Sequence, residues 1–347
     1  MNPIVLTIII SSLSLGTILT FIGSHWFLIW MGLEINTLAI IPLMIRQHHP
    51  RAVEASTKYF ITQATASALL LFASVMNAWT SGEWSLIEMI NPTPATLATI
   101  ALALKIGLAP LHFWLPEVLQ GLDLTTGLIL STWQKLAPFA ILLQLYPSLN
   151  SNLLVFLGIL STMVGAWGGL NQTQLRKILA YSSIAHLGWM ITILHYSHNL
   201  TQLNLILYII MTLTTFLLFK MFNSTKINSI SSSSSKSPLL SIIALMTLLS
   251  LGGLPPLSGF MPKWLILQEL TKQNLIITAT IMAMMTLLSL FFYLRLCYAT
   301  TLTMIPNSIN MLSSWRIKSS YNLTLTTTAS LSILLLPITP SILMLLS

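Results

Sequence analysis

Charged residues are scarce in this chain. Only 6% of its 347 residues are Asp, Glu, Lys or Arg, whereas 55% are hydrophobic. About a quarter of the residues in a soluble domain are charged, so a chain with this composition could not cover a water-exposed surface. The sequence therefore predicts an all-α polytopic membrane protein. Its net charge of +8 comes from basic residues scattered through short loops and apolar runs, which does not indicate a nucleic-acid partner.

Cysteine and the common cofactor motifs are also lacking. The single cysteine, Cys297, excludes an internal disulfide, a CxxC redox pair and an iron–sulfur cluster ligated by this chain alone. The sequence has no GxGxxG, no P-loop and no HExxH, so we expect this chain to bind no cofactor and no metal. Its first residues, MNPIVLTIII, lack the features of a cleaved signal or transit peptide, so we expect the first helix to be retained.

Long apolar runs fill most of the chain. A helix needs about 20 residues to span a bilayer, and on this measure the sequence predicts eleven transmembrane helices. Their expected cores are residues 3–23, 25–45, 57–77, 95–115, 124–146, 151–170, 175–195, 201–222, 239–266, 275–298 and 323–346.

Two of these runs are interrupted by glycine and proline in the same pattern. GLAPLHFWLPE at Gly107 and GLPPLSGFMPK at Gly253 are 146 residues apart and share Gly, Leu, Pro, Leu and Pro at matching positions. Proline removes a backbone donor that lipid cannot replace, so Pro110 and the pair Pro255 and Pro256 predict broken helices that line a wet, protein-enclosed space. Interrupted helices at corresponding positions of two halves are typical of a transport site.

This repeat also predicts the domain organisation. Residues 1–146 and 150–299 form two five-helix sets within one membrane domain, and 322–347 is a final helix. Because five is odd, the second set enters the membrane from the opposite side. The two sets are therefore expected to form an inverted repeat.

Basic residues lie mostly in alternate loops, which predicts the orientation of the chain. Eleven of the fifteen Lys and Arg residues fall on one side, and the side rich in these residues is the inner one. We therefore expect the N-terminus on the inner side and the C-terminus on the outer side. The eleven residues are Arg46, Arg51, Lys58, Arg176, Lys177, Lys220, Lys226, Lys236, Arg295, Arg316 and Lys318.

Three ionisable residues lie deep within predicted spans. Glu34 is the only acid inside a span, and Lys105 precedes the first helix break. Lys135 is about 16 Å from either end of its span, whereas a lysine side chain reaches only about 6 Å. Such residues are costly in a bilayer and usually functional. The alternatives are a structural ion pair for Glu34 and a packing role for Lys135.

His112, His186 and Lys263 are weaker candidates. His112 is seven residues after Lys105 and shares its helix face only if the helix continues past Pro110. His186 lies mid-span, where a lone histidine is as often a core residue as a functional one. Lys263 lies near the end of its span, so its ammonium could instead reach the membrane surface.

Together these residues predict a proton or cation pathway. Burial disfavours the charged form of Lys and of Glu, so such groups can gain or lose protons near neutral pH. If Glu34 and the three lysines were all charged, the interior would carry a net charge of +2. We therefore expect at least one lysine to be neutral, with a protonation state that depends on its neighbours and that a distant event can change.

Five stretches carry a resemblance to a known family. They are MGLEINTLAIIPLM at Met31, ALALKIGLAPLHFWLPEV at Ala101, WQKLAPF at Trp133, RKILAYSSIAHLGWM at Arg176 and GGLPPLSGFMPKW at Gly252. In this order they resemble the antiporter-like membrane subunits of respiratory complex I, in their shortened animal mitochondrial form. The resemblance covers the whole chain.

The resemblance implies a role for each candidate. Glu34 is similar to the family's conserved-helix glutamate, Lys105 to the lysine of the first broken helix, and Lys135 to the central lysine that follows it. Lys263 matches the basic residue of the second broken helix. The same resemblance puts His112 and His186 in a hydrophilic axis across the membrane interior.

The implied function is proton translocation across the mitochondrial inner membrane, coupled to electron transfer from NADH to ubiquinone. NADH, FMN, iron–sulfur clusters and ubiquinone would be bound by other subunits, and the partners would be neighbouring membrane-arm subunits and lipid. The inner side becomes the matrix, and the C-terminus faces the intermembrane space. Longer family members have fourteen helices, so eleven imply that three are missing at the N-terminus.

Two other functions remain open from the sequence. A stand-alone cation/proton antiporter would need a selective metal-ion site, usually built from carboxylate and carbonyl oxygens, and the predicted interior offers one carboxylate, Glu34. A structural subunit without pumping of its own would keep the buried charges as assembly contacts. Loss of coupled turnover in an assembled complex, after one lysine is changed, separates pumping from the structural role.

Overall fold

All regular elements in the described part of the chain are helices, as the sequence predicts. The computed structural model describes residues 2–46, 48–86, 89, 91–234, 238–301 and 323–346. Three basic residues on which the predicted orientation depends, Lys236, Arg316 and Lys318, lie outside those ranges. The chain divides into two units, Met1–Ser161 and Thr162–Ser347.

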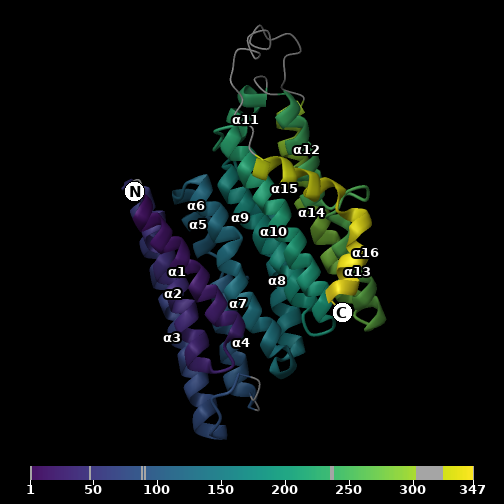
Figure 1. Ribbon diagram of the computed structural model, residues 1–347. Coiled ribbons are helices and arrows are strands. Elements are labelled where there is room, and N and C mark those ends of the chain that lie inside the picture. The colour runs from purple at the N-terminus through teal and green to yellow at the C-terminus, as the bar shows by residue number, and fades with distance from the viewer. Residues whose placement is uncertain are drawn as a thin grey trace. The chain divides into compact units, whose positions relative to one another are not determined.

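The first unit is built from the helices α1 (Pro3–Ile22), α2 (Trp26–Met44), α3 (Pro50–Ser81), α4 (Pro92–Ile106), α5 (Trp114–Gly121), α6 (Leu124–Ser131), α7 (Trp133–Leu145), η1 (Tyr146–Ser148) and the start of α8 (Ser151–Gly169). In this unit α1, α2 and α3 lie side by side (Figure 1). α3 also packs against α4 and α5, and α7 packs against α1, α2 and α4. The bundle thus brings α2, α3, α4 and α7 together.

The first predicted break lies between α4 and α5. α4 ends at Ile106, and α5 begins at Trp114. Gly107 has φ +86°, a left-handed conformation that glycine adopts without strain, and its N–H donates to the carbonyl of Ala103 at 2.9 Å. This glycine therefore ends α4 with a left-handed cap.

Two side chains complete the cap of α4. The indole Nε1 of Trp114 donates to the carbonyl of Leu104 at 3.0 Å, and the Gln63 amide donates to the carbonyl of Lys105 at 3.4 Å. The last carbonyls of a helix have no helical partner, and lipid offers no donor. These two side chains therefore allow a helix to end inside an apolar bundle.

The helix that carries Lys135 is also interrupted, which the sequence analysis did not predict. α6 and α7 are separated at Thr132, whose hydroxyl donates to the carbonyl of Leu128 at 2.7 Å, a bond of the kind that bends helices. Pro138 inside α7 has no N–H for the carbonyl of Gln134. Lys135 thus lies on a short helical segment between two defects in backbone hydrogen bonding.

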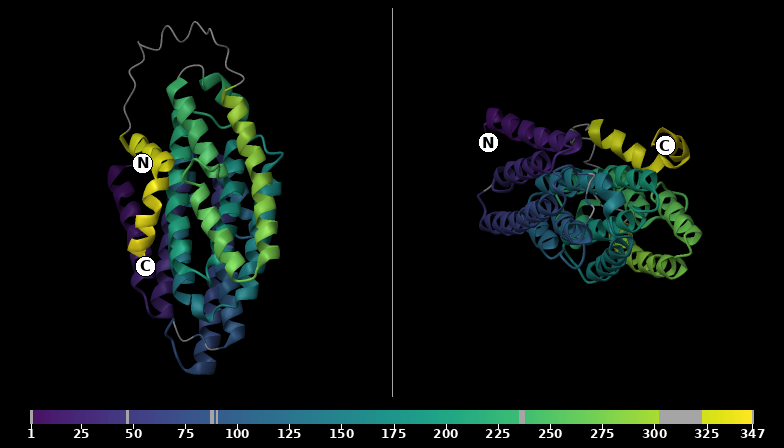
Figure 2. Two further views of the ribbon diagram at one scale, coloured as in Figure 1. Left: turned by 90° about the vertical axis from the view of Figure 1, so that its right-hand side faces the viewer. Right: turned by 90° about the horizontal axis from the view of Figure 1, so that it is seen from below.

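The second unit is built from the end of α8, α9 (Leu175–Ile193), α10 (His198–Met221), α11 (Ile227–Ser234), α12 (Pro238–Gly252), α13 (Phe260–Lys272), α14 (Ile276–Thr301), α15 (Leu323–Leu334), η3 (Leu336–Ile338) and α16 (Thr339–Leu346). α10 packs against α9, α12 and α15, and α14 packs against α12 and α13. The C-terminal helices α15 and α16, yellow in Figure 2, bend by 67°. The predicted span 323–346 is therefore not one straight helix.

The break between α12 and α13 repeats the local structure of the first break. Gly253 has φ +83°, and its N–H donates to the carbonyl of Leu249 at 3.1 Å. α13 then begins at Phe260. Gly253, Leu249 and Phe260 each lie 146 residues after their counterpart at the first break, so the two stretches that match in sequence also match in helix end, cap and restart.

Membrane-spanning length and exposed apolar side chains agree with the predicted class. Seven of the described helical segments are long and apolar enough to cross a membrane, or eight if α15 and α16 form one bent span. Large apolar side chains point outward on them, for example Ile22 at 78% and Ile277 at 76% exposed. The prediction of an all-α polytopic membrane protein is confirmed. α3 is 32 residues long and extends past its predicted core, 57–77, at both ends.

Candidate functional site

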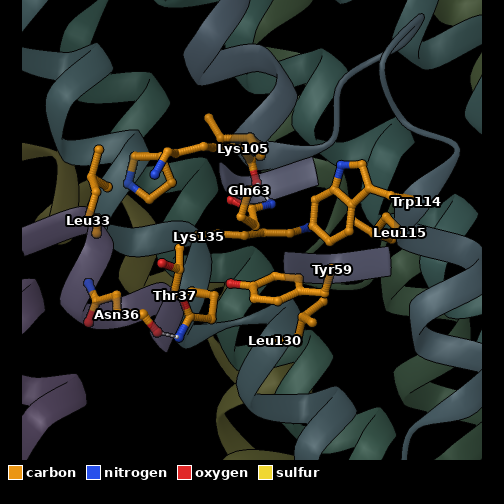
Figure 3. Close-up of a pocket in the computed structure, with 14 residues that line it drawn as sticks. Leu33, Asn36, Thr37, Tyr59, Gln63, Lys105, Trp114, Leu115, Leu130 and Lys135 are labelled. Atoms are coloured by element: carbon orange, nitrogen blue, oxygen red, sulfur yellow. Dashed lines mark hydrogen bonds between the residues drawn. The ribbon is translucent and has the colours of Figure 1, made fainter. Parts of the chain in front are cut away.

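Lys105 of α4 and Lys135 of α7 line one cavity in the first unit. Both lysines are buried, at 6% and 5% exposure. In the view of Figure 3 the Lys135 side chain extends toward Trp114, with Gln63 between it and Lys105. The lining residues are Leu33, Asn36, Thr37, Tyr59, Gln63, Lys105, Ile106, Trp114, Leu115, Leu130, Gln134, Lys135, Ala137 and Pro138.

The cavity has the size of a water site. It offers about 20 Å³ to the centre of a water-sized sphere, and roughly 10–15 Å³ of such space is enough for one water. A water there would have polar neighbours, because amine, hydroxyl and amide groups lie among the lining residues. The cavity therefore offers a place for one water among residues that include both lysines.

Lys105 lies on the last turn of α4, where the helix dipole stabilises a cation. Its Nζ donates no hydrogen bond to any residue that the structure describes. The carboxylate of Glu34 acts on this amine electrostatically. Burial disfavours the charged form of Lys105 most strongly, and the helix end and the Glu34 carboxylate offset part of this effect. The N–H bonds of the amine remain available to water in the cavity.

Glu34 of α2 is not among the residues that line the cavity, but it contacts one of them, Thr37. Its side chain is half-buried, and the hydroxyl of Thr37 donates to the Glu34 carboxylate at 3.2 Å. Thr37 itself lines the cavity, and the Glu34 charge also acts on Tyr59 across from it. A change in the charge of Glu34 is therefore felt inside the cavity.

Several polar residues of this cavity were missed by the sequence analysis. Tyr59 and Gln63 lie four residues apart on α3 and are both buried, so they form a polar stripe within an apolar span. That spacing is a signal that could have been found from the sequence. The contact of Gln134 with Asn36, an amide-to-carbonyl hydrogen bond of 3.2 Å between α7 and α2, has no such signal.

His112 is buried in the break between α4 and α5 but is not among the residues that line the cavity. Because α4 ends at Ile106, the spacing of seven residues does not put His112 and Lys105 on one helix face. The imidazole instead packs against the ring of Phe113, with a centroid distance of 4.3 Å.

His186 and Lys263 lie in the second unit. His186 is buried on α9, and its ring is 5.7 Å from that of Tyr208 on α10. Lys263 lies on α13, and its Nζ donates to the carbonyls of Gly252 at 2.9 Å and Leu251 at 3.4 Å. Lys263 therefore caps the C-terminal end of α12, a geometry that satisfies orphan carbonyls and favours the helix dipole.

Replacing Lys263 with methionine is expected to lower the stability of the second unit. The carbonyls of Gly252 and Leu251 would lose their donor, at a cost of about 1–3 kcal/mol. The measurement is the melting temperature and amount of assembled complex, with Lys272→Met as the control because Lys272 is exposed and forms only a surface ion pair with Glu269. Wild-type stability of the Lys263 variant would contradict the capping role.

Comparison with known families agrees with these features. Residues 23–289 match the family described as NADH:quinone oxidoreductase/Mrp antiporter, transmembrane. The chain belongs to this family. Residues 290–343 match a second family, the NADH dehydrogenase subunit 2 C-terminus. Together the two matches cover almost the whole chain.

Relatives within the NADH:quinone oxidoreductase/Mrp antiporter family are similar over their full length. The chain is 83% identical over 346 residues to NADH-ubiquinone oxidoreductase chain 2 of Squalus acanthias, with 99% of each chain covered. It is 84% identical over 348 residues to the chain of the same name from Scyliorhinus canicula, with both chains fully covered.

The fold is similar to that of chains in solved membrane complexes. A chain of respiratory complex I from Thermus thermophilus with bound aureothin superposes with a TM-score of 0.82 at 26% identity, over 96% of this chain and 79% of that chain. A chain of the archaeal membrane-bound sulfane sulfur reductase superposes with a TM-score of 0.81 at 19% identity, which shows a shared fold alone.

Proposed function

We propose that this chain is a core membrane subunit of proton-translocating NADH:ubiquinone oxidoreductase, respiratory complex I. The relatives at 83% and 84% identity carry the name of that enzyme, which supports the assignment. The observation that carries the mechanism is the pair Lys105 and Lys135, buried on different helices around one water-sized cavity. The Lys105 amine has no hydrogen-bond partner among the described residues, and burying such an amine is costly, so packing alone does not explain this arrangement.

In the proposed mechanism one proton is bound by Lys105 or by Lys135 in turn. Two positive charges around one small buried cavity repel each other strongly, so the two lysines share one excess proton instead of each holding its own. A negative charge on Glu34 favours the proton on Lys105, and loss of that charge favours Lys135. A signal that changes Glu34 therefore moves a proton through the cavity, and His112, His186 and Lys263 are proposed as further positions of the pathway.

The membrane topology is part of the proposal. To the seven long spans we add α9, the broken pairs α4 with α5 and α12 with α13, and the bent α15 with α16, which makes eleven. The matched caps at Gly107 and Gly253 support two inverted five-helix repeats. The Lys and Arg distribution supports an N-terminus in the matrix and a C-terminus in the intermembrane space, with the chain in the mitochondrial inner membrane.

The redox chemistry is assigned to other subunits. One cysteine and no nucleotide motif support a chain that carries no flavin, cluster or quinone, so NADH, FMN, iron–sulfur clusters and ubiquinone are bound elsewhere in the complex. The proposed partners are the neighbouring membrane-arm subunits and the lipid bilayer. This chain supplies residues that bind protons, and their protonation is coupled to electron transfer in other subunits.

The substitution Glu34→Gln tests this function. It removes the charge that acts on Lys105 but keeps a side chain of the same shape, so NADH-to-quinone flow and proton ejection are expected to fall together by about three- to tenfold. Both rates are measured on assembled complex in sealed inner-membrane vesicles. Glu117→Gln is the matched control, because Glu117 is exposed and pairs with Lys58 at 2.7 Å. Equal, wild-type rates in both variants would contradict the proposal.

A further inference from the structure

A second buried polar cluster lies in the second unit, where α9 packs against α10 and α14. It consists of Ser182, Ser183 and His186 of α9, Tyr208 of α10 and Tyr293 of α14, and none of these residues is more than 5% exposed. The four hydroxyl residues have no part in the lysine cavity, and the sequence analysis did not single them out as site residues. A cluster of five polar side chains inside a membrane-spanning bundle indicates a function.

The two serines orient the two phenols. The hydroxyls of Ser182 and Ser183 each donate to the carbonyl three residues earlier on α9, at 2.8 and 2.7 Å. Each serine hydroxyl has one proton, so its oxygen is left only as an acceptor for the tyrosine bonded to it. Tyr208 is hydrogen-bonded to Ser183, and Tyr293 to Ser182. In this resting state each phenol donates to its serine, and its own lone pairs face away from that serine.

Other polar side chains surround Tyr208 and Tyr293. Tyr208 and Tyr293 are close enough to interact electrostatically, and the His186 ring lies 5.7 Å from that of Tyr208. Asn204, one turn before Tyr208 on α10, is 2% exposed, and its amide nitrogen has no hydrogen-bond partner among the described residues. Asn204 and Tyr208 share one face of α10, so this buried donor lies on the side of the helix that carries the Tyr208 phenol.

We propose that Tyr208 and Tyr293 form a hydroxyl relay that carries protons to and from His186, with Ser182 and Ser183 as positioning residues. The relay deepens the proposed function and rests on it. Histidine suits one end of such a chain because it gains and loses a proton near neutral pH. A hydroxyl suits the middle because it donates and accepts at the same oxygen.

The transfer step conserves charge at each phenol. The O–H bond of Tyr208 first rotates from Ser183 toward Tyr293, and that of Tyr293 rotates from Ser182 toward a water. A proton leaving the His186 ring then bonds to the Tyr208 oxygen, while the original Tyr208 O–H bond breaks and its proton passes to the Tyr293 oxygen, each transfer being direct or through one water. Tyr293 releases its own proton to the next water. Both phenols are neutral before and after, no electron moves, and rotation of the two O–H bonds back to the serines resets the relay.

The substitution Tyr208→Phe tests the relay in the assembled complex. Phenylalanine keeps the ring and its packing but removes the hydroxyl, so electron flow and proton ejection are expected to fall by about three- to tenfold. The ratio of the rate in H2O to that in D2O is expected to at least double, because proton transfer becomes the slow step. A purely structural tyrosine would leave this ratio unchanged.

Tyr196→Phe is the matched control. Tyr196 is partly buried against the apolar cluster around Trp189 and Ile193, so loss of its hydroxyl is expected to change neither the rates nor the isotope ratio. Tyr293→Phe is the second relay variant. It tests the relay by the same rates and isotope ratio if Tyr208→Phe does not assemble. Loss of rate with a raised isotope ratio in an assembled relay variant supports the relay.

The Lys105→Met complex separates failure of the relay from failure of the proposed function. If the relay variants assemble with wild-type rates and isotope ratios while Lys105→Met loses both activities, the relay is wrong and the proposed function stands. If Lys105→Met also retains both activities, the proposed function itself is wrong.

Discussion

Replacing Lys105 with methionine is expected to leave an assembled complex whose NADH-to-quinone flow and proton ejection both fall by about tenfold or more. Methionine keeps an unbranched apolar stem of similar length, so the packing of α4 is preserved. The Lys105 amine donates no hydrogen bond to a described residue, so no structural bond is lost. What disappears is the proton that the cavity shares between Lys105 and Lys135.

The measurement uses sealed inner-membrane vesicles and normalises both rates to the amount of assembled complex. Lys272→Met is the control, because it removes one lysine charge from an exposed position in the same chain. NADH oxidation by a water-soluble artificial acceptor is expected to stay at the wild-type rate, since the redox sites are assigned to other subunits. If the Lys105 variant keeps wild-type flow and ejection, the buried lysine is architectural and the structural role replaces the pumping role.

The substitution Gly259→Ala is expected to abolish assembly. An added Cβ would lie 1.8 Å from the carbonyl oxygen of Ser250, far inside contact distance. The oxygen belongs to the backbone and the Cβ is bonded directly to the backbone, so no side-chain rotation can relieve the clash. Gly259 has φ −70°, which alanine adopts freely, so the whole effect is steric. Overpacking of this kind costs about 3 kcal/mol or more, because the break between α12 and α13 would have to open.

Gly252→Ala provides the matched control for this effect. It is the last residue of α12, directly before the same break, but its added Cβ would meet nothing nearer than a side-chain atom of Tyr293 at 3.7 Å, an ordinary contact. The amount of assembled complex on native gels and its melting temperature are the measurements. Normal assembly of Gly259→Ala, or equal losses in both variants, would contradict the close approach at Gly259.

Features that depend on neighbouring residues in the sequence were predicted well. The Gly-and-Pro pattern predicted where two helices break, and the structure adds the left-handed caps at Gly107 and Gly253 and the side chains that cap the helix ends. Lys105 and Lys135 were recognised because a cation in the middle of an apolar run is conspicuous without knowledge of its neighbours. Span length likewise follows directly from the run of apolar residues.

Features that depend on contacts between helices were not predictable in the same way. Nothing in the sequence says that α4 and α7 bring Lys105 and Lys135 to one cavity, because helix pairing has no local signature. The interruption at Thr132 was missed because threonine is common in helices and bends them only when its hydroxyl bonds back to the backbone.

The two stretches that match in sequence differ at the positions where they end. Glu117 of the first stretch corresponds to Lys263 of the second. Glu117 is exposed and pairs with Lys58, whereas Lys263 turns inward and caps α12. The end of α4 is capped instead by Trp114 and Gln63. Both helix ends need hydrogen-bond donors inside the bundle, and different residues supply these donors at the two breaks.

The central claim is that Lys105 and Lys135 act as one unit around one cavity, and the double variant Lys105→Met/Lys135→Met tests it most directly. Residues that act together are non-additive on removal. Proton ejection from assembled wild-type, single-variant and double-variant complexes is the measurement. If the two lysines act as one unit, the double variant loses no more proton ejection than the single variant with the lower activity. A loss equal to the product of the two single losses would show that the lysines act independently and would contradict the account.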